Sequence, residues 1–309
     1  MVDFKGKDIL DGAQFTREDI EHIMRVAEDM RARLQDQRAL DVAKGYVLGA
    51  LFFEPSTRTR LSFETAMHRL GGSVVGFSSA EATSTAKGET LVDTIRTVDQ
   101  YVDIIAMRHP QIGSAQAAAE VAQAPILNGG DGAGQHPTQA LLDLFTIRAE
   151  RGGVDGQTIA LCGDLKNGRT VHAGVEVYKH YDCRLIFVAP DPLKMPAEIT
   201  ERLRAYRVKV EETSDLAAAL AQADVLYMTR IQKERFEDPA EYERLKDAYI
   251  LTRALVERVR PDVTILHPLP RVNEITADVD GLSNAAYFRQ MKNGVYVRMA
   301  LIGLVLGRL

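Results

Sequence analysis

Cysteine is scarce in this sequence of 309 residues, and long apolar runs are missing from it. Its two cysteines, Cys162 and Cys183, form no C-x-x-C pair. We therefore expect no disulfide framework, two inert core thiols and a cytoplasmic location. Residues 1–7 lack the apolar stretch of a signal peptide. The most apolar segment, 295–306, contains Arg298 and is shorter than the ~20 residues that cross a bilayer, so we predict no membrane contact.

Several motifs that carry chemistry are also missing. The sequence contains no G-x-x-x-x-G-K-[ST], H-E-x-x-H, G-x-S-x-G or G-x-G-x-x-G; after Gly130-Asp131-Gly132, the position of the third glycine is Gln135. These absences argue against nucleotide sites of those types, a metal centre and a serine nucleophile. We expect neither metal nor cofactor. A net charge of −5 and a pI near 5.9 argue against nucleic-acid partners.

What the sequence does contain is an alternation of apolar runs and amphipathic stretches. Thr16, with Asp19 at the capping-box position, predicts the start of the first helix. Strands separated by helices indicate βαβ units, and the length favours two domains. We predict an α/β protein with two doubly wound domains, each a parallel sheet flanked by helices. The domains are 1–137 and 138–290, joined through a helix at 137–150, with a terminal helix at 291–309 packing back on the first. The strands are expected at 46–53, 73–77, 104–107, 126–127, 158–162, 184–188, 208–210, 225–228 and 264–266.

Arginines follow the predicted strands in both halves of this acidic chain. Ligands bind beyond the carboxyl ends of the strands in open parallel sheets, and charge of one sign is focused in clefts. A site for a multiply anionic ligand is therefore favoured over scattered surface charge. The arginines concerned are Arg58, Arg108, Arg169, Arg230 and Arg271.

The segment Ser56-Thr57-Arg58-Thr59 lies between a predicted strand and a helix that runs to Leu70, with Gly71 at the C′ position. Backbone N–H groups at a helix start bind phosphate, and hydroxyl groups with an arginine complete such a site. Simple capping by Ser56 or Thr57 is commoner, but capping does not explain the arginines. Arg60 has a structural alternative, pairing with Glu54 or with another carboxylate.

His136 precedes Pro137 at a predicted helix start and follows a glycine-rich segment, 129–134. A lone histidine is more often a packing or capping residue. Its position here favours a functional role, and we expect it to donate a hydrogen bond to a substrate carbonyl rather than to act as a general base.

The motifs FEPSTRTR at 53–60, HPTQ at 136–139 and HPLP at 267–270 resemble the aspartate/ornithine carbamoyltransferases in order and spacing. KGET at 87–90, GDLKNGRTVH at 163–172 and MTRIQKER at 228–235 resemble the aspartate-specific branch. Ala86 stands where many members carry a second lysine, so Ser84 matches less firmly than Lys87. The resemblance runs from about residue 4 to the end of the chain.

This resemblance implies a role for each matching residue. The catalytic residues would be Arg58, Thr59, Arg108, His136 and Lys87. Carbamoyl phosphate would be bound by Ser56, Thr57, Arg58, Thr59, Ser84, Lys87, Arg108, His136, Gln139, Pro268 and Leu269. L-Aspartate would be bound by Lys87, Arg169, Arg230 and Gln232.

The activity implied by the resemblance is transfer of a carbamoyl group from carbamoyl phosphate to L-aspartate, the committed step of de novo pyrimidine biosynthesis. The amine would attack directly through a tetrahedral oxyanion, without a covalent enzyme intermediate. Ser84 and Lys87 would serve a neighbouring subunit in a homotrimer, and a separate zinc-bearing regulatory chain stays open. The alternative is ornithine carbamoyltransferase, which would call for a cysteine in place of Pro268. An anion-binding module without catalysis is the rival from another class.

Overall fold

The computed structural model describes residues 3–236 and 238–309. Met1 and Val2 lie outside the described residues. They belong to the segment 1–7, in which no signal peptide was expected. The chain divides into two compact units, and each is described by itself below. Unit 1 comprises Met1–Leu142 and Met291–Leu309, and unit 2 comprises Asp143–Gln290. Helices α5 (Pro137–Arg151) and α11 (Tyr287–Val305) each begin in one unit and end in the other.

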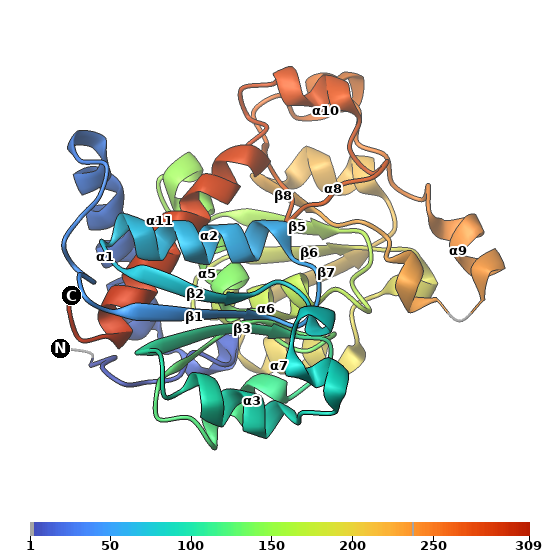
Figure 1. Ribbon diagram of the computed structural model, residues 1–309. Coiled ribbons are helices and arrows are strands. Elements are labelled where there is room, and N and C mark those ends of the chain that lie inside the picture. Colours follow the sequence, from blue (N-terminus) through green and yellow to red (C-terminus); the bar gives the residue numbers. More distant parts are fainter. Residues whose placement is uncertain (1–2, 237) are drawn as a thin grey trace. The chain divides into compact units, whose positions relative to one another are not determined.

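Unit 1 is built on a parallel sheet whose strand order is β2-β1-β3-β4 (Figure 1). The chain first fills one side of β1 with β2 and then crosses to the other side for β3 and β4. The connections from β1 and β3 therefore run in opposite directions, and in open parallel sheets ligands bind beyond the carboxyl ends of the strands at such a reversal point. The strands are β1 (Val47–Phe52), β2 (Ser73–Phe77), β3 (Ile104–His109) and β4 (Ile126–Asp131).

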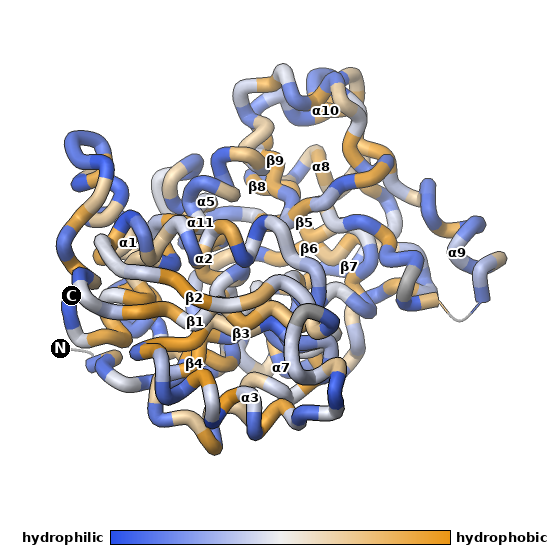
Figure 2. The backbone as a smooth tube through the Cα atoms, in the orientation of Figure 1, coloured by the Kyte–Doolittle hydropathy of each residue, from blue (hydrophilic) through white to orange (hydrophobic). Residues whose placement is uncertain are grey.

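The helices of unit 1 bury the apolar faces of this sheet. α2 packs against β1 and β2, and α4 packs against β3 and β4. Figure 2 shows apolar colour concentrated along the strands, because strands covered on both faces are apolar throughout. One core cluster joins Leu51, Ile105 and Met107 to Ile95 of α3. The helices are α1 (Arg17–Asp36), α2 (Thr57–Arg69), α3 (Leu91–Val98) and α4 (Ser114–Ala119), with short 3-10 turns η1 (Gly12–Gln14), η2 (Ala80–Ala82) and η3 (Ser84–Lys87).

Unit 2 contains a second parallel sheet, with strand order β7-β6-β5-β8-β9. Its winding direction reverses between β5 and β8, so the loops after these two strands diverge as well. The strands are β5 (Thr158–Cys162), β6 (Arg184–Val188), β7 (Lys209–Thr213), β8 (Val225–Met228) and β9 (Thr264–Leu266). The helices and 3-10 turns are α6 (Arg169–Tyr178), η4 (Asp191–Leu193), α7 (Ala197–Ala205), α8 (Leu216–Gln222), η5 (Lys233–Arg235), α9 (Pro239–Leu245), α10 (Arg253–Val259) and η6 (Ala277–Gly281).

The structure confirms the α/β fold with parallel sheets and most element positions. Thr16 caps α1 in a reciprocal capping box with Asp19. Gly71 has a φ of 86°, and a Cβ there would lie 2.4 Å from the Leu40 carbonyl oxygen, so only glycine fits this helix end. Among the described residues, no helix is long and apolar enough to span a membrane.

Three strands differ from the prediction. β3 was expected at 104–107 and continues to His109. β4 continues through 128–131, which was expected to be a loop, and β7 occupies 209–213 rather than 208–210. Parallel pairing of β4 with β3 overrides the turn preference of its glycines. The solvent-facing edge strand β7 carries charged residues, which hide its apolar pattern.

Candidate active site

The start of α2 follows directly from β1 at the reversal point of the unit 1 sheet. Ser56 is the N-cap residue, yet its side chain makes no capping hydrogen bond. Capping is therefore not what this hydroxyl does here, while the first turn of a helix presents backbone N–H groups outward. Thr57 and Arg58 are exposed, and Thr59 is buried.

Arg108 lies within β3, next to Phe52 of β1, rather than beyond the strand end. Its Nε and Nη2 atoms both lie 2.6 Å from Glu54 Oε1, and Nη1 donates to the Gly129 carbonyl at 3.4 Å. Burial lowers the pKa of Arg108, and the Glu54 carboxylate opposes that shift. A guanidinium has five N–H donors. These contacts use three of them, so two remain for a ligand.

Arg60, by contrast, is a structural residue of the helix. Its Nε lies 3.2 Å from Glu64 Oε1 one turn further on. Arg60 was expected to pair with Glu54 or with another carboxylate, and Glu64 is such a carboxylate.

His136 is buried at the start of α5, and its Nε2 lies 3.5 Å from Thr59 Oγ1. A turn organised by Asp131 leads into it: Asp131 Oδ1 accepts from the Gln135 N–H at 2.6 Å, and Oδ2 accepts from the Gly113 N–H at 2.9 Å. Gly132 has a φ of 55°, and a Cβ there would lie 2.4 Å from the Pro110 carbonyl oxygen. The buried Gln139 follows one turn later on α5.

Ser84 and Lys87 occupy the 3-10 turn η3 and are both exposed. Thr83 caps this turn by accepting from the Thr85 N–H at 3.2 Å. The turn packs against η2 and α3.

In unit 2, the buried Asp164 ties together the loops that follow β5 and β8. Its Oδ1 accepts from the Asn167 N–H at 3.0 Å, and its carboxylate also accepts from the Gln232 N–H. Gln232 Nε2 donates in turn to the Asn167 carbonyl at 3.2 Å. Burial raises the pKa of Asp164, while the hydrogen bonds from Asn167 and Gln232 lower it.

This arrangement places Arg169 and Arg230 at the reversal point of the second sheet. Arg169 is the first residue of α6, after the N-cap Gly168, whose Cβ would lie 2.5 Å from the Asp164 carbonyl oxygen. Arg230 follows β8 by two residues. Both arginines are partly buried. Gly163, with a φ of 127°, lets β5 pass the Thr229 carbonyl closely.

The loop after β9 has an unusual backbone. Leu269 has a φ of 56°, in the left-handed region that non-glycine residues rarely adopt, and the bond between Leu269 and Pro270 is cis. Buried His267 accepts the Leu269 N–H on Nδ1 at 2.8 Å, and its Nε2 lies 2.7 Å from Glu274 Oε1.

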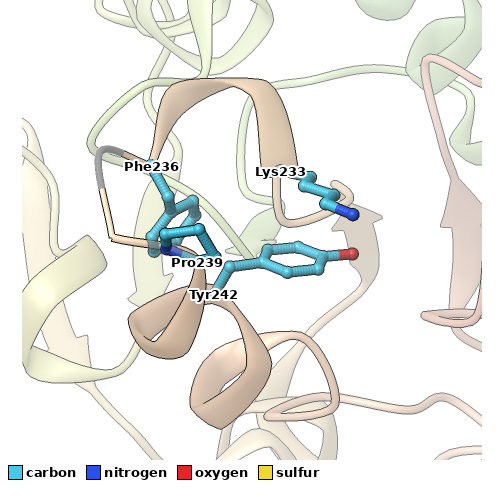
Figure 3. A pocket seen from close by; sticks show the side chains of 4 residues that line it. All are labelled: Lys233, Phe236, Pro239 and Tyr242. Atoms are coloured by element: carbon cyan, nitrogen blue, oxygen red, sulfur yellow. The ribbon is translucent and has the colours of Figure 1, made fainter.

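A separate pocket of about 440 Å³ lies beyond Gln232, around η5 and α9. Figure 3 shows the Tyr242 ring between Lys233 and Pro239; Lys233 Nζ lies 5.8 Å from the centre of that ring. The pocket is lined by Lys233, Phe236, Pro239 and Tyr242, and none of these is a predicted substrate ligand.

The part of the chain that the structure describes contains no cluster of three or more histidine, cysteine, aspartate or glutamate residues suited to a metal. Cys162 and Cys183 are buried, and burial raises the pKa of the Cys162 thiol far above its usual range. A thiol that stays protonated is a poor nucleophile.

Sequence patterns missed the residues that hold the candidate site groups. These residues are carboxylates that bind arginine or backbone N–H groups: Glu54, Asp131, Asp164 and Glu274. The first three lie within a quoted motif or the glycine-rich segment, which was the available signal, whereas Glu274 lies four residues after the motif at 267–270.

Comparison with known proteins identifies the family. Residues 7–149 match the aspartate/ornithine carbamoyltransferase carbamoyl-P binding domain, and residues 155–305 match the Asp/Orn binding domain. The chain is 53% identical over 306 residues to the aspartate carbamoyltransferase catalytic subunit of Thermococcus gammatolerans, covering 99% of both chains. The chain therefore belongs to the aspartate/ornithine carbamoyltransferase family.

Comparison with solved structures indicates the branch of the family to which the chain is similar. Aspartate transcarbamoylase from Trypanosoma cruzi, in complex with carbamoyl aspartate and phosphate, has a TM-score of 0.93 at 45% identity, covering 98% of this chain and 97% of that one. The catalytic subunit of M. jannaschii aspartate transcarbamoylase has a TM-score of 0.91 at 47% identity, covering 97% and 98%. Within the family, the chain is a carbamoyltransferase of the aspartate branch rather than the ornithine branch.

Proposed function

We propose that this chain transfers the carbamoyl group of carbamoyl phosphate to the amine of L-aspartate, giving N-carbamoyl-L-aspartate and phosphate. The observation that carries the proposal is the cluster at the unit 1 reversal point, where an unengaged helix-cap hydroxyl, Arg108 with two donors to spare and His136 beside Thr59 belong to one sheet edge. Unit 1 would bind carbamoyl phosphate, and unit 2 would bind aspartate.

The phosphate would lie at the start of α2, where backbone N–H groups and the side chains of Ser56, Thr57, Arg58 and Thr59 supply donors. Arg108, His136 and Thr59 would donate to the carbonyl oxygen. Gln139 and the carbonyl groups of Pro268 and Leu269 would accept hydrogen bonds from the carbamoyl NH₂.

In the reaction, the neutral aspartate amine attacks the carbonyl carbon, and a C–N bond forms as the carbonyl oxygen becomes an oxyanion. The donors on that oxygen are preorganised, so they stabilise the charge as it develops. The C–O bond to phosphate then breaks, and the amine proton passes to a phosphate oxygen. Alignment and charge stabilisation carry the catalysis, and no covalent enzyme intermediate is needed.

Arg169, Arg230 and Gln232 would bind the two carboxylates of aspartate. Two arginines suit a dianionic amino acid, whereas ornithine carries a cationic side chain. Pro268 stands where the ornithine branch would call for cysteine. These features support aspartate as the acceptor.

Ser84 and Lys87 are both exposed to solvent in the 3-10 turn η3. We propose that they complete the site of a neighbouring copy in a homotrimer, so an isolated subunit would be nearly inactive. A cytoplasmic location, favoured by the low cysteine content, and a separate regulatory chain belong to the same proposal.

The test is kinetic. The purified chain should form carbamoyl aspartate from carbamoyl phosphate and aspartate, and no citrulline from ornithine. Light scattering should give the mass of a trimer, and added nucleotides without effect on rate would argue that regulation requires another chain. Calorimetric binding of carbamoyl phosphate without any product would instead favour a binding module.

A further inference from the structure

We propose that His267 is a positioning residue that fixes the direction of the Pro268 carbonyl by holding the peptide group between Pro268 and Leu269. The proposal rests on the function proposed above, which assigns this carbonyl to the carbamoyl NH₂. Its evidence is a buried hydrogen-bond network within unit 2. The side chains of His267 and Glu274 are only 1% and 5% exposed.

The contacts of the imidazole assign its tautomer. Nδ1 lies 2.8 Å from the Leu269 nitrogen, whose hydrogen it must accept, so Nδ1 carries no proton. Nε2 therefore carries the hydrogen and donates it to Glu274 Oε1 at 2.7 Å. An imidazolium would direct a proton from Nδ1 at the Leu269 N–H, so the neutral ring is the form that fits.

Glu274 is held in its charged, accepting form. Its Oε2 accepts from the backbone N–H groups of Val272 at 3.0 Å and Asn273 at 3.1 Å. Burial alone would raise the pKa of Glu274, but the hydrogen bonds from His267 and from backbone N–H groups lower it below its usual value. His267, Val272 and Asn273 all donate to this carboxylate, and the ring of His267 cannot turn over without losing one of its bonds.

The backbone of His267 is held from the other side. Its N–H donates to Gln290 Oε1 at 3.0 Å, and Gln290 Nε2 donates to Asp143 Oδ1 at 2.6 Å. Asp143 Oδ2 accepts from the Tyr227 hydroxyl of β8 at 2.8 Å. Tyr227, Asp143 and Gln290 are all buried. His267 is therefore fixed to the sheet through its main chain and to Glu274 through its side chain.

This fixation determines where the substrate-facing acceptor points. The Pro268 carbonyl and the Leu269 N–H belong to one planar trans peptide group, so they point in opposite directions. Holding the N–H on His267 Nδ1 therefore turns the carbonyl away from the imidazole. It also stabilises the left-handed conformation of Leu269, with φ 56°, which a leucine otherwise disfavours. Backbone strain of this kind is maintained only where the surroundings determine it.

Three variants test the proposal: His267→Leu, His267→Asn and Glu274→Gln. Leucine removes both side-chain bonds. Asparagine can retain the bond from the Leu269 N–H, since its side-chain oxygen accepts from the N–H two residues further along the chain. His267→Asn is therefore the matched control. In Glu274→Gln, the side-chain NH₂ must face either the Nε2–H of His267 or the backbone N–H groups, all of which are donors. This clash disfavours the His267 tautomer that carries its hydrogen on Nε2 and accepts the Leu269 N–H on Nδ1.

The readouts are kcat for carbamoyl-aspartate formation and the ratio of carbamoyl phosphate affinity to inorganic phosphate affinity. We expect His267→Leu to lower kcat by ~10²-fold, the effect of a misplaced reacting group. It should lower the affinity ratio by about 10-fold, the value of one hydrogen bond, with phosphate affinity itself unchanged. Asparagine should restore most of kcat, and Glu274→Gln should resemble leucine.

The outcomes separate the two proposals. Wild-type protein that forms no product sinks the proposed function. Active wild-type protein with an unaltered kcat and affinity ratio in His267→Leu overturns the positioning role, as does His267→Asn that is no better than His267→Leu. If the leucine variant does not fold, judged by its thermal transition, a wild-type kcat in Glu274→Gln overturns the role instead.

Discussion

The two units hold their proposed ligand-binding groups by partly different means. In unit 1 a contact between two charged side chains holds Arg108 on Glu54, and the carboxylate of Asp131 fixes the turn before α5. In unit 2 the organising groups are buried carboxylates, Asp164 and Glu274, which accept backbone N–H groups and so fix loops. Changes in unit 1 should therefore remove a reacting donor, whereas changes in unit 2 should loosen the backbone that presents one.

This difference fits the chemistry proposed for each unit. An oxyanion that exists only in the transition state needs donors that are already in place and charged. An amino acid that must enter and leave needs loops of defined shape, and buried carboxylates can define a loop by collecting several N–H groups at once.

The largest effect is expected for Arg108→Ala, which should lower kcat by about 10³-fold, because a charged, preorganised donor to the oxyanion is lost. Arg108→Lys should be nearly as poor, since one ammonium group cannot hold Glu54 and a ligand with the same geometry. Steady-state kinetics with a thermal-unfolding control checks this. A near-normal kcat in Arg108→Ala would exclude Arg108 from catalysis.

His136→Ala should lower kcat by about 10²-fold, less than the arginine change, because a neutral donor contributes less than a charged one. If His136 donates to the carbonyl and is no general base, the pH profile of the remaining activity should keep its shape. Rates measured from pH 6 to 9 test this. An unchanged kcat would refute the donor role, and loss of the acidic limb of the profile would instead indicate a general base.

In unit 2, the change Asp164→Asn should affect mainly KM for aspartate rather than kcat. Asp164→Asn leaves one acceptor oxygen but directs an amide at a backbone donor, a mismatch of ~1–3 kcal/mol. The loops of Arg169 and Gln232 should loosen, and KM for aspartate should rise by about 10-fold or more, while the affinity for phosphate in unit 1 stays the same. Equal losses for both ligands would mean that Asp164 acts on the whole fold rather than on the aspartate loops.

Much of the fold could be predicted because buried strands are apolar throughout and helix ends carry specific residues. The runs that became β1, β5 and β8 have this character, and Thr16 with Asp19 forms the predicted capping box. The glycines of β4 misled the prediction, because pairing with β3 is a tertiary effect that local turn preference cannot register.

Some residues of the candidate site could also be predicted from the sequence, and others could not. Ser56, Thr59 and His136 lie at helix starts, which sequence patterns locate well. The pairing of Arg108 with Glu54 spans 54 positions, and Asp164 and Glu274 are buried although acidic residues are usually exposed. Sequence periodicity carries no information on such contacts, so the groups that hold the site emerged only from the structure.

The smallest expected effect is on the pH dependence of stability, to which Glu274 and Asp164 of unit 2 should contribute with opposite signs. The pKa of Glu274 is lowered from 4.5, so its stabilisation is present above that pH and is lost as pH falls through the folded-state pKa. The pKa of Asp164 is raised from 3.8, so acid favours the folded state at that residue. Between about pH 6 and 3, urea unfolding of Glu274→Gln should depend less on pH than that of wild type, and Asp164→Asn should depend on it more. Identical pH slopes in all three proteins would contradict the opposite roles of these carboxylates.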